Sequence, residues 1–335
     1  MEVKELTDMK ILNKILNQPV RLWHAFFDHV KPFGLKVAWY KMVTVETNRF
    51  INTSFGEYFA KRYHQSVLGY LKKRYAKEIA NLSFEFSKVK PVETINPKIW
   101  QCWWQGEDGL KDITKVCTES VKDNCGKYSV VLITWDNYQE YVKIPSVAIR
   151  KYKEGKVTLT ELTDIMRMNL LYQNGGLWVD TTVLVTEPIT KMCVESQYFT
   201  CKEICRNHAF VSDYRWNTSC IGGQKNHPLF GFVAKMFEVY WTYEDQLIDY
   251  YLFDYLIELA YQNIKSVKDD IDKQPFNNPH KHDAQSLLNK DFNEQKFKEI
   301  KHDTMFFKLS RKAGCLEEYN GKKTLYKILK EKYIG

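Results

Sequence analysis

The architecture is predicted most sharply by residues 158–186, which read TLTELTDIMRMNLLYQNGGLWVDTTVLVT. Thr158 and Glu161 have capping-box spacing, apolar residues then recur at helical intervals, and two glycines follow that suit a positive-φ helix end. The next apolar run, residues 177–179, leads directly into Asp180. The pattern therefore predicts a helix, a tight turn and a buried strand with Asp180 at its carboxyl end, which is where open α/β sheets bind ligands.

Short β-rich runs alternate with helical stretches through most of the chain. The strands are expected at residues 95–103, 128–135, 177–185 and 198–202, and the helices at residues 111–124, 158–174, 228–243 and 247–263, with a loop at residues 277–290. Such alternation favours βαβ units and a mixed, mostly parallel central sheet. We expect one Rossmann-type α/β domain over residues 91–335 and a helical region over residues 1–90, with helices at residues 3–17, 22–30 and 54–81.

Composition excludes several classes of protein. The chain has 335 residues, 44% of them hydrophobic, yet no apolar run approaches the ~18 residues of a membrane-spanning helix. The first residues, MEVKELTDMKILNK, are charged and do not resemble a secretion signal. The eight cysteines form no CxxC pair, so we expect reduced thiols, no structural metal site and a cytoplasmic location.

The positive charge is concentrated near the N-terminus. Residues 1–90 contain 16 Lys and Arg against 8 Asp and Glu, a net of +8 that equals the net charge of the whole chain. The same segment is rich in aromatic residues, among them Trp23, Phe27 and Trp39. Two interpretations remain open: amphipathic helices that bind an anionic membrane surface on the cytoplasmic side, or helices that pack on the main domain with ordinary solvated charges. Nucleic-acid binding is not expected, because the basic residues are dispersed and no recognition motif accompanies them.

Three segments carry a resemblance to a known family: IWQCWWQGEDG at 99–109, LTDIMRMNLLYQNGGLWVDTT at 162–182 and DYYLFD at 249–254. With them the chain resembles the capsular polysaccharide synthesis glycosyltransferases, which are similar to the DXD-bearing sugar transferases with a GT-A fold. The resemblance covers residues 92–315. It implies a GT-A-like domain, retention of configuration, and donor-binding residues at Trp100, Gln101, Trp103, Asp164, Arg167, Gly175, Gly176 and Asp180.

A divalent metal is the cofactor that the resemblance implies. In a D-x-D motif both acids serve the metal and the nucleotide diphosphate, but this chain reads Asp180-Thr181-Thr182. Mn²⁺ or Mg²⁺ often uses only one or two carboxylates, with phosphate oxygens and water completing the shell. We therefore predict Asp180 and Thr182 as metal ligands, Thr182 lying on the same strand face as Asp180. The other interpretation makes Asp180 a structural hydrogen-bond partner.

Asp164 and Arg167 are three residues apart and so are neighbours on one helix face. In a transferase, Asp164 would accept hydrogen bonds from the donor sugar and Arg167 would fix it and attract the phosphates. The alternative is a surface ion pair that stabilises the helix by a few tenths of a kcal/mol. Trp103 could stack on a base or belong to the core.

Two further segments contain candidate residues. Asp245 and Asp249 are spaced for one helix face, and Asp249 is predicted as a catalytic acid on the acceptor side, against the alternative of a solvated acidic face. In HDTMFFKLSRK, residues 302–312, the side chains of Lys308, Ser310 and Lys312 are predicted to bind the donor phosphates, and the neighbouring Arg311 adds charge. A solvated basic tail is the alternative.

The sequence thus favours a metal-assisted hexosyltransferase. It would move a sugar from a nucleotide-sugar, most simply a UDP-sugar, to a lipid-linked or growing bacterial surface polysaccharide. The competing hypotheses are a non-catalytic scaffold that keeps the fold and binds a nucleotide-sugar or a membrane, and a basic adaptor acting through residues 1–90.

Overall fold

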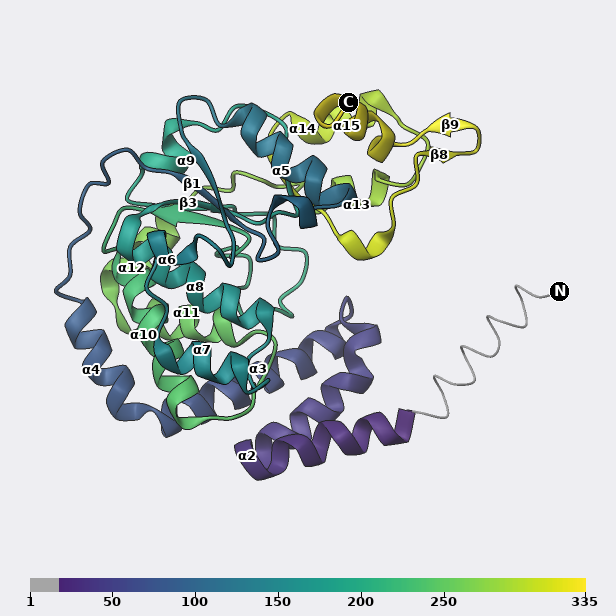
Figure 1. The fold of residues 1–335 in the computed structure, drawn as a ribbon. Coiled ribbons are helices and arrows are strands. Elements are labelled where there is room, and N and C mark those ends of the chain that lie inside the picture. The colour runs from purple at the N-terminus through teal and green to yellow at the C-terminus, as the bar shows by residue number, and fades with distance from the viewer. Residues whose placement is uncertain (1–17) are drawn as a thin grey trace.

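A five-stranded sheet lies at the centre of the computed structural model, which describes residues 18–335 (Figure 1). Its strands, in spatial order, are β2 (Val130–Ile133), β1 (Ile99–Cys102), β3 (Gly176–Val179), β6 (Cys220–Gly223) and β5 (Tyr198–Thr200). β1 is parallel to both β2 and β3, whereas β6 is antiparallel to both β3 and β5. Only β6 therefore opposes the other strands, and the expected mixed, mostly parallel sheet is confirmed.

Alternate side chains of β3 enter two different cores. Trp178 packs in the larger core, with side chains from the helices on one face of the sheet, whereas Leu177 and Val179 pack in the core on the other face. The apolar run before Asp180 is thus buried on both faces, as expected for a central strand.

Helices cover both faces of this sheet (Figure 1). The first face is covered by α6 (Tyr138–Tyr141), α7 (Ser146–Lys153), α8 (Leu159–Asn174), α10 (Pro228–Tyr243), α11 (Leu252–Asn263) and α12 (Lys265–Lys273). The other face carries α5 (Asp112–Asn124) and α9 (Lys191–Glu195), followed by α13 (Asp283–Leu287), α14 (Glu294–Lys301) and α15 (Leu325–Tyr333). Short 3-10 turns occur at Asn48–Phe50, Glu107–Gly109 and Arg311–Ala313.

Two small antiparallel ribbons complete the strands. β4 (Val183–Val185) pairs with β7 (Phe306–Lys308), and β8 (Glu318–Tyr319) pairs with β9 (Lys322–Lys323). The first ribbon brings a segment from near the C-terminus beside the turn that follows β3, because Val183 is the register partner of Lys308.

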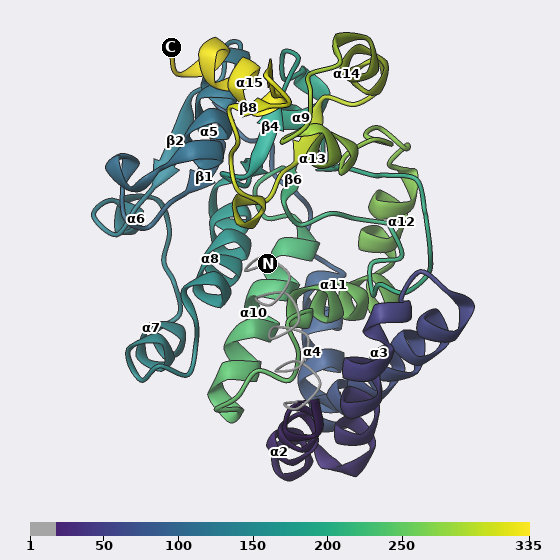
Figure 2. The same cartoon turned by 90° about the vertical axis from the view of Figure 1, so that its right-hand side faces the viewer.

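The N-terminal region is helical, as predicted, and lies at one end of the molecule, away from α13 to α15 (Figure 2). It consists of α2 (Gln18–Thr47), α3 (Ser54–Arg74) and α4 (Ala76–Phe86). The helix predicted at residues 3–17 lies outside the described residues. The one predicted at 22–30 is part of the longer α2, which is kinked at Gly34, and the one predicted at 54–81 is broken at Tyr75.

Helix α8 and its turn form as the sequence indicates. The Thr158 and Glu161 side chains make a reciprocal capping box, and the helix stops at Gly175 with a φ of 68°. A Cβ at Gly175 would lie 2.3 Å from Thr94 Oγ1, and one at Gly176 would lie 2.4 Å from the Lys98 carbonyl oxygen. The two glycines therefore allow the chain to start β3 close beside β1.

Several sequence predictions are wrong in detail. The single strand expected at residues 177–185 is β3 and β4, separated by a turn at Asp180. The helix expected at residues 247–263 begins only at Leu252, and the loop expected at residues 277–290 contains α13. The eight cysteines are all free, as expected. Over residues 18–335, no helix combines the length and the apolarity needed to cross a membrane.

Candidate active site

Asp180 ends strand β3 and begins a tight turn. Its backbone N–H donates to the Ser219 carbonyl at 2.9 Å, and its carbonyl accepts from the Val183 N–H at 2.8 Å. Trp178, two residues earlier, donates its indole N–H to Asp180 Oδ1 at 2.7 Å. The backbone and one side-chain contact thus fix the carboxylate at the carboxyl end of the central strand.

Arg167, on α8, links two carboxylates. Its Nη2 lies 3.2 Å from Asp164 Oδ1 and 3.2 Å from Asp180 Oδ1, while Nη1 donates to the Thr218 carbonyl at 2.8 Å. The guanidinium carbon also lies 4.6 Å from the centre of the Trp178 ring. Because only 5% of the residue is exposed, this is a fixed interior cation and not a surface ion pair.

Lys308, on β7, contacts the other carboxylate oxygen of Asp180. Its Nζ donates to Asp180 Oδ2 at 2.6 Å and to Thr182 Oγ1 at 2.7 Å. The β4–β7 pairing sets this position, because Lys308 is opposite Val183, the residue that follows Thr182. Asp180 consequently contacts one cation through each oxygen.

These contacts give Asp180 and Asp164 different pKa values. Burial alone would raise the pKa of Asp180, but the positive charges of Lys308 and Arg167 lower it to about 2. Burial raises the pKa of Asp164 to about 7, with Arg167 opposing the shift. Asp180 is therefore a permanent anion, whereas Asp164 titrates near neutral pH.

Two cavities meet at Asp180. We call the smaller one, about 310 Å³, the Trp103 cavity; its walls include Trp103, Asp164, Arg167, Thr182 and Arg311. The larger one, about 640 Å³, is the Asp254 cavity, and its walls include Asn207, Tyr214, Tyr250, Asp254 and Lys308. Asp180 lines both, so a molecule that reaches from one cavity into the other must pass it.

The Trp103 cavity combines an aromatic wall with a cation. The guanidinium carbon of Arg311 lies 5.6 Å from the centre of the Trp103 ring, and the buried Trp103 indole N–H has no hydrogen-bond partner in the protein. Trp104 also lines this cavity, and its indole N–H donates to Thr163 Oγ1 at 2.7 Å. A flat ring and an anionic group attached to it fit this chemistry.

The Asp254 cavity contains a third carboxylate. Asp254, on α11, accepts a hydrogen bond from the Trp216 indole at 2.8 Å. Burial raises the pKa of Asp254 to about 6, although the Trp216 hydrogen bond and the charge of Arg167 act against the shift. Tyr250 stands at the exposed side of the same cavity. This arrangement can accept hydrogen bonds from hydroxyl groups near Asp180.

Comparison with known families matches residues 47–329 to the family described as "Capsular polysaccharide synthesis protein". The chain belongs to this family. The match confirms the resemblance and extends beyond it at both ends, over residues that include α3 and α4. A comparison with curated proteins finds no match. A solved structure named "PaToxG Glycosyltransferase" is similar with a TM-score of 0.37 and 11% identity, covering 64% of this chain and 82% of that one.

The structure brings together six of the thirteen site residues predicted from the sequence. Trp103, Asp164, Arg167, Asp180 and Thr182 line the Trp103 cavity, and Lys308 contacts the last two of them.

The other predicted donor-binding residues lie elsewhere. Trp100 is a core residue whose indole N–H donates to the Gly175 carbonyl at 2.8 Å, and Gln101 is completely buried. Gly175 and Gly176 lie at the end of β3 away from Asp180, since Gly175 precedes the strand and Gly176 is its first residue. Ser310 and Lys312 line neither cavity; the Ser310 hydroxyl accepts from the Lys312 N–H, and Arg311 between them faces Trp103 instead.

Asp249 is not in the Asp180 site either. It accepts hydrogen bonds from Lys41 Nζ at 2.6 Å and from the Tyr63 hydroxyl at 2.8 Å, beside a separate cavity of about 260 Å³ under the N-terminal helices. The expected helix face with Asp245 does not exist, because both residues precede α11. Asp245 instead pairs with Lys151 and, at 2.9 Å, with Lys156.

Asp254 is the carboxylate that sequence reasoning missed. It is the last residue of the DYYLFD segment, whose first acid, Asp249, is the one that the sequence predicts as catalytic. One signal could have identified it: Asp254 lies within a run of otherwise apolar and aromatic helix positions, where an unpaired acid is costly to bury.

The residues at Asp180 fit a divalent metal poorly. Asp180 Oδ1 accepts from Arg167 and Trp178, Asp180 Oδ2 accepts from Lys308, and Thr182 Oγ1 accepts from Lys308. A Mn²⁺ or Mg²⁺ ion bound to Asp180 and Thr182 would have to displace the ammonium group. Thr182 also supplies a neutral oxygen where a second carboxylate would be expected.

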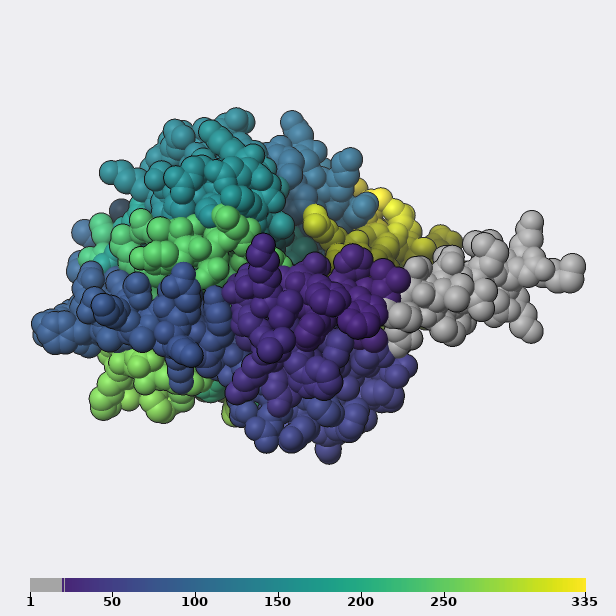
Figure 3. All heavy atoms as spheres, turned by 90° about the horizontal axis from the view of Figure 1, so that it is seen from below, coloured from purple at the N-terminus to yellow at the C-terminus, as the bar shows by residue number. Residues whose placement is uncertain are grey.

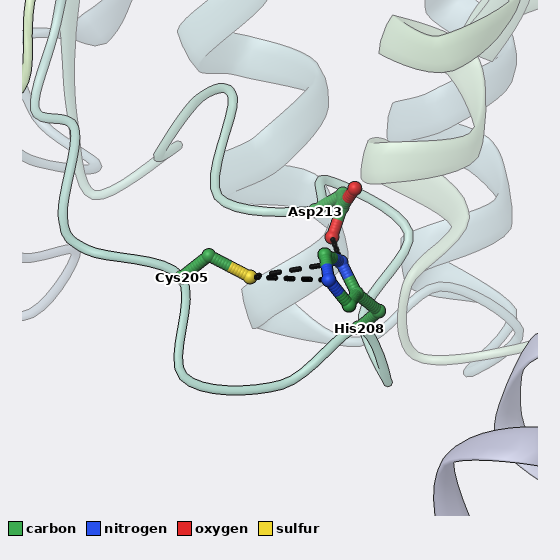
Figure 4. A group of neighbouring side chains, drawn as sticks. All are labelled: Cys205, His208 and Asp213. Atoms are coloured by element: carbon green, nitrogen blue, oxygen red, sulfur yellow. Dashed lines mark hydrogen bonds and ion pairs between the residues drawn. The ribbon is translucent and has the colours of Figure 1, made fainter. Parts of the chain in front are cut away.

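A different group of side chains has the spacing of metal ligands (Figure 4). Cys205 Sγ lies 3.6 Å from His208 Nδ1, and that nitrogen lies 2.6 Å from Asp213 Oδ1. Among the residues that the structure describes, this is the group of three His, Cys, Asp or Glu side chains whose ligand atoms all lie within 4.8 Å of one another. All three belong to the connection between β5 and β6, and none lines the Trp103 or the Asp254 cavity.

Proposed function

We propose that this protein is a glycosyltransferase that moves a hexosyl group from a nucleotide-sugar, a UDP-sugar in the simplest case, to a polysaccharide or lipid-linked acceptor. The observation that carries the proposal is the Arg167–Asp180–Lys308 cluster at the junction of an aromatic, cationic cavity with a cavity that contains Asp254. Membership of a capsular polysaccharide synthesis family supports the polysaccharide acceptor.

The donor would occupy the Trp103 cavity and extend past Asp180. Its base would stack on Trp103, and its diphosphate would lie near the cations Arg311, Arg167 and Lys308. Asp164 would accept hydrogen bonds from donor-sugar hydroxyls, while Arg167 keeps it in position. The acceptor would enter through the larger Asp254 cavity.

The proposed step is a transfer with retention of configuration. The bond between the anomeric carbon and the diphosphate oxygen breaks, and its electron pair stays on that oxygen. The acceptor hydroxyl oxygen, oriented by a hydrogen bond to Asp254, bonds to the anomeric carbon from the same face. Its proton passes to the departing diphosphate. Positive charge next to the diphosphate lowers the barrier, because negative charge develops there in the transition state.

A donor panel tests this proposal. Purified protein is incubated with UDP-, GDP-, ADP- and CDP-sugars and a lipid-linked oligosaccharide acceptor, and released nucleoside diphosphate and elongated acceptor are measured. We expect both products with one donor class. The Asp180→Asn variant controls for contaminating hydrolases. A non-catalytic scaffold would bind a nucleotide-sugar without turnover, so binding with no product from any donor would contradict the proposal.

The rate of transfer should fall in acid. Burial raises the pKa of Asp254 to about 6 and that of Asp164 to about 7, so both carboxylates take up protons as the pH falls through this range. A protonated Asp254 no longer accepts a hydrogen bond from the acceptor hydroxyl. We expect kcat/KM to decline about tenfold per pH unit below about pH 7, where Asp164 is protonated, and more steeply below about pH 6, where Asp254 is protonated as well. Initial rates between pH 5 and pH 9 check this, and a constant rate over that range would contradict the assignment. Asp254→Asn should remove the Asp254 component and lower kcat by about 100-fold.

The N-terminal helices present apolar side chains to solvent. On α2, Trp23 is 60% and Leu35 70% exposed, and the Trp23 and Phe27 rings stack at 5.3 Å. Exposed Lys31 and Lys36 lie among them. Figure 3 shows α2 and α3 side by side at the surface of the molecule. This aromatic and basic face fits the surface of an anionic membrane on its cytoplasmic side, where a lipid-linked acceptor would be presented.

Charge removal on this face should weaken membrane binding. The double variant Lys31→Ala, Lys36→Ala is expected to bind phosphatidylglycerol vesicles roughly 30-fold less tightly, since each basic residue near an anionic surface contributes about 1 kcal/mol. Co-sedimentation measures the binding. The matched control is Lys296→Ala, Lys298→Ala on α14, at the opposite end of the molecule (Figure 2). Equal binding by both double variants, or a wild-type dimer that buries the aromatic face, would contradict this role.

A further inference from the structure

We propose that the ammonium group of Lys308 takes the place of a divalent metal in this enzyme, and that donor binding needs no metal ion. The inference rests on the proposed function and concerns the same site. It reverses the expectation that Mn²⁺ or Mg²⁺ bound to Asp180 and Thr182 assists the transfer.

The position of Lys308 is the first argument. Its Nζ bridges Asp180 Oδ2 and Thr182 Oγ1, at 2.6 and 2.7 Å, and these are the two side chains that the sequence pattern assigns to a metal. An ammonium group has three N–H donors, so one remains for a ligand after these two bonds. Lys308 lines the Asp254 cavity, while Thr182 lines the Trp103 cavity, and the ammonium group therefore lies between the two.

The fixed backbone around Lys308 is the second argument. The Leu309 N–H donates to the Thr182 carbonyl at 2.9 Å, and the Lys308 N–H donates to the Lys281 carbonyl at 2.8 Å. The backbone of Lys308 and Leu309 is thus held to two different segments, the one that contains Lys281 and the turn that follows β3. A cation held in this way needs little reorganisation when charge develops on a ligand.

Charge balance is the third argument. Asp180, Thr182 and Lys308 together have no net charge. An acid at position 182 would add one negative charge, and a divalent ion in place of the ammonium group would add one positive charge, so that the sum would again be zero. The lysine therefore provides the same balance that a second carboxylate with a metal would provide. Arg167 and Arg311 then supply the excess positive charge for a diphosphate.

During transfer, the free N–H of Lys308 would donate to a diphosphate oxygen. That oxygen gains negative charge as the electron pair of the bond to the anomeric carbon moves onto it. The lysine keeps its own proton, and the proton that the acceptor hydroxyl loses still passes to the diphosphate. No metal-bound species enters the step.

Calorimetric titration with UDP tests the inference. For protein treated with EDTA, we expect an affinity that changes less than twofold when Mn²⁺ is added. Lys308→Ala should weaken UDP binding by about 10- to 100-fold, the range for loss of a hydrogen bond to a charged group. Lys290→Ala, an exposed lysine near α13, is the matched control and should bind as the wild type does.

A second variant keeps the test decisive if Lys308→Ala weakens binding for another reason. Thr182→Asp combined with Lys308→Ala should bind UDP only when Mn²⁺ is present, because it replaces the lysine by an acid pair. If the wild-type protein binds UDP only when Mn²⁺ is present, the inference about Lys308 is overturned and the proposed function is not. Failure of UDP, GDP, ADP and CDP to bind, with or without Mn²⁺, would overturn the proposed function together with it.

Discussion

Asp180→Asn should lower kcat for sugar transfer by about 100- to 1000-fold, the range observed when one preorganised electrostatic contact is removed from an active site. Asp180 is the carboxylate that contacts Lys308 and Arg167 at the same time. An amide of the same shape offers one acceptor oxygen and no charge, so it cannot hold both cations. They would then repel each other across the place where the diphosphate has to lie.

The amide should keep the packing at this position, since it can still accept from the Trp178 indole. Thermal denaturation shows whether the variant is folded, and kcat is measured at saturating donor. The matched control is Asp245→Asn, because Asp245 also contacts two lysines but is 66% exposed and lines neither cavity. A kcat within threefold of the wild type for Asp180→Asn, in a folded protein, would remove Asp180 from the site.

Local sequence signals predicted the centre of the fold well. The capping box, the helical spacing and the two glycines are all interactions within a few residues, and they define α8, its end and the start of β3. The position of Asp180 follows directly, because the residue after so short a strand must lie at the edge of the sheet where the strand ends. Helix α10, Pro228–Tyr243, has the predicted bounds for the same reason.

The acceptor side could not be predicted in this way. Asp249 and Asp254 belong to one segment, and both have apolar neighbours. Which acid faces the cavity depends on where α11 begins and on contacts with distant residues, such as those of Lys41 and Tyr63 with Asp249. Likewise, Lys308 was predicted to approach the phosphates, but its contact with Thr182 depends on the β4–β7 register, which joins segments more than 120 residues apart.

The N-terminal region also has features that local sequence predicts and features that depend on distant contacts. Its aromatic and basic composition was evident, but which rings are buried was not. Tyr63 and His64 turn toward the main domain, where His64 Nδ1 lies 2.7 Å from the Tyr255 hydroxyl, whereas Trp23 remains exposed. One side of the helices therefore packs on the domain, as the second interpretation expects, and the other side faces solvent, where membrane binding stays a proposal.

Replacement of Arg167 should have the largest effect on stability, and the effect should depend on pH. Arg167→Met keeps an unbranched apolar stem at this position but leaves Asp164 and Asp180 without their shared cation. Removing one partner of a buried ion pair costs about 3–5 kcal/mol. Arg167 lowers the pKa of Asp164, which burial raises to about 7, so in the variant this pKa rises further.

At pH 6 Asp164 is therefore protonated in the variant, which removes its repulsion with Asp180. At pH 8.5 protonation of Asp164 recovers less free energy. Urea denaturation at the two pH values should show a loss of about 3–5 kcal/mol in the free energy of unfolding at pH 8.5 and a clearly smaller loss at pH 6. Arg150→Met, which removes an exposed arginine 3.8 Å from Glu154, should cost less than about 0.5 kcal/mol at both. An equal loss at both pH values would contradict this prediction. It would mean that Arg167 stabilises the fold by packing on Trp178 and not by its charge between the two carboxylates, and that Asp164 does not titrate in this pH range.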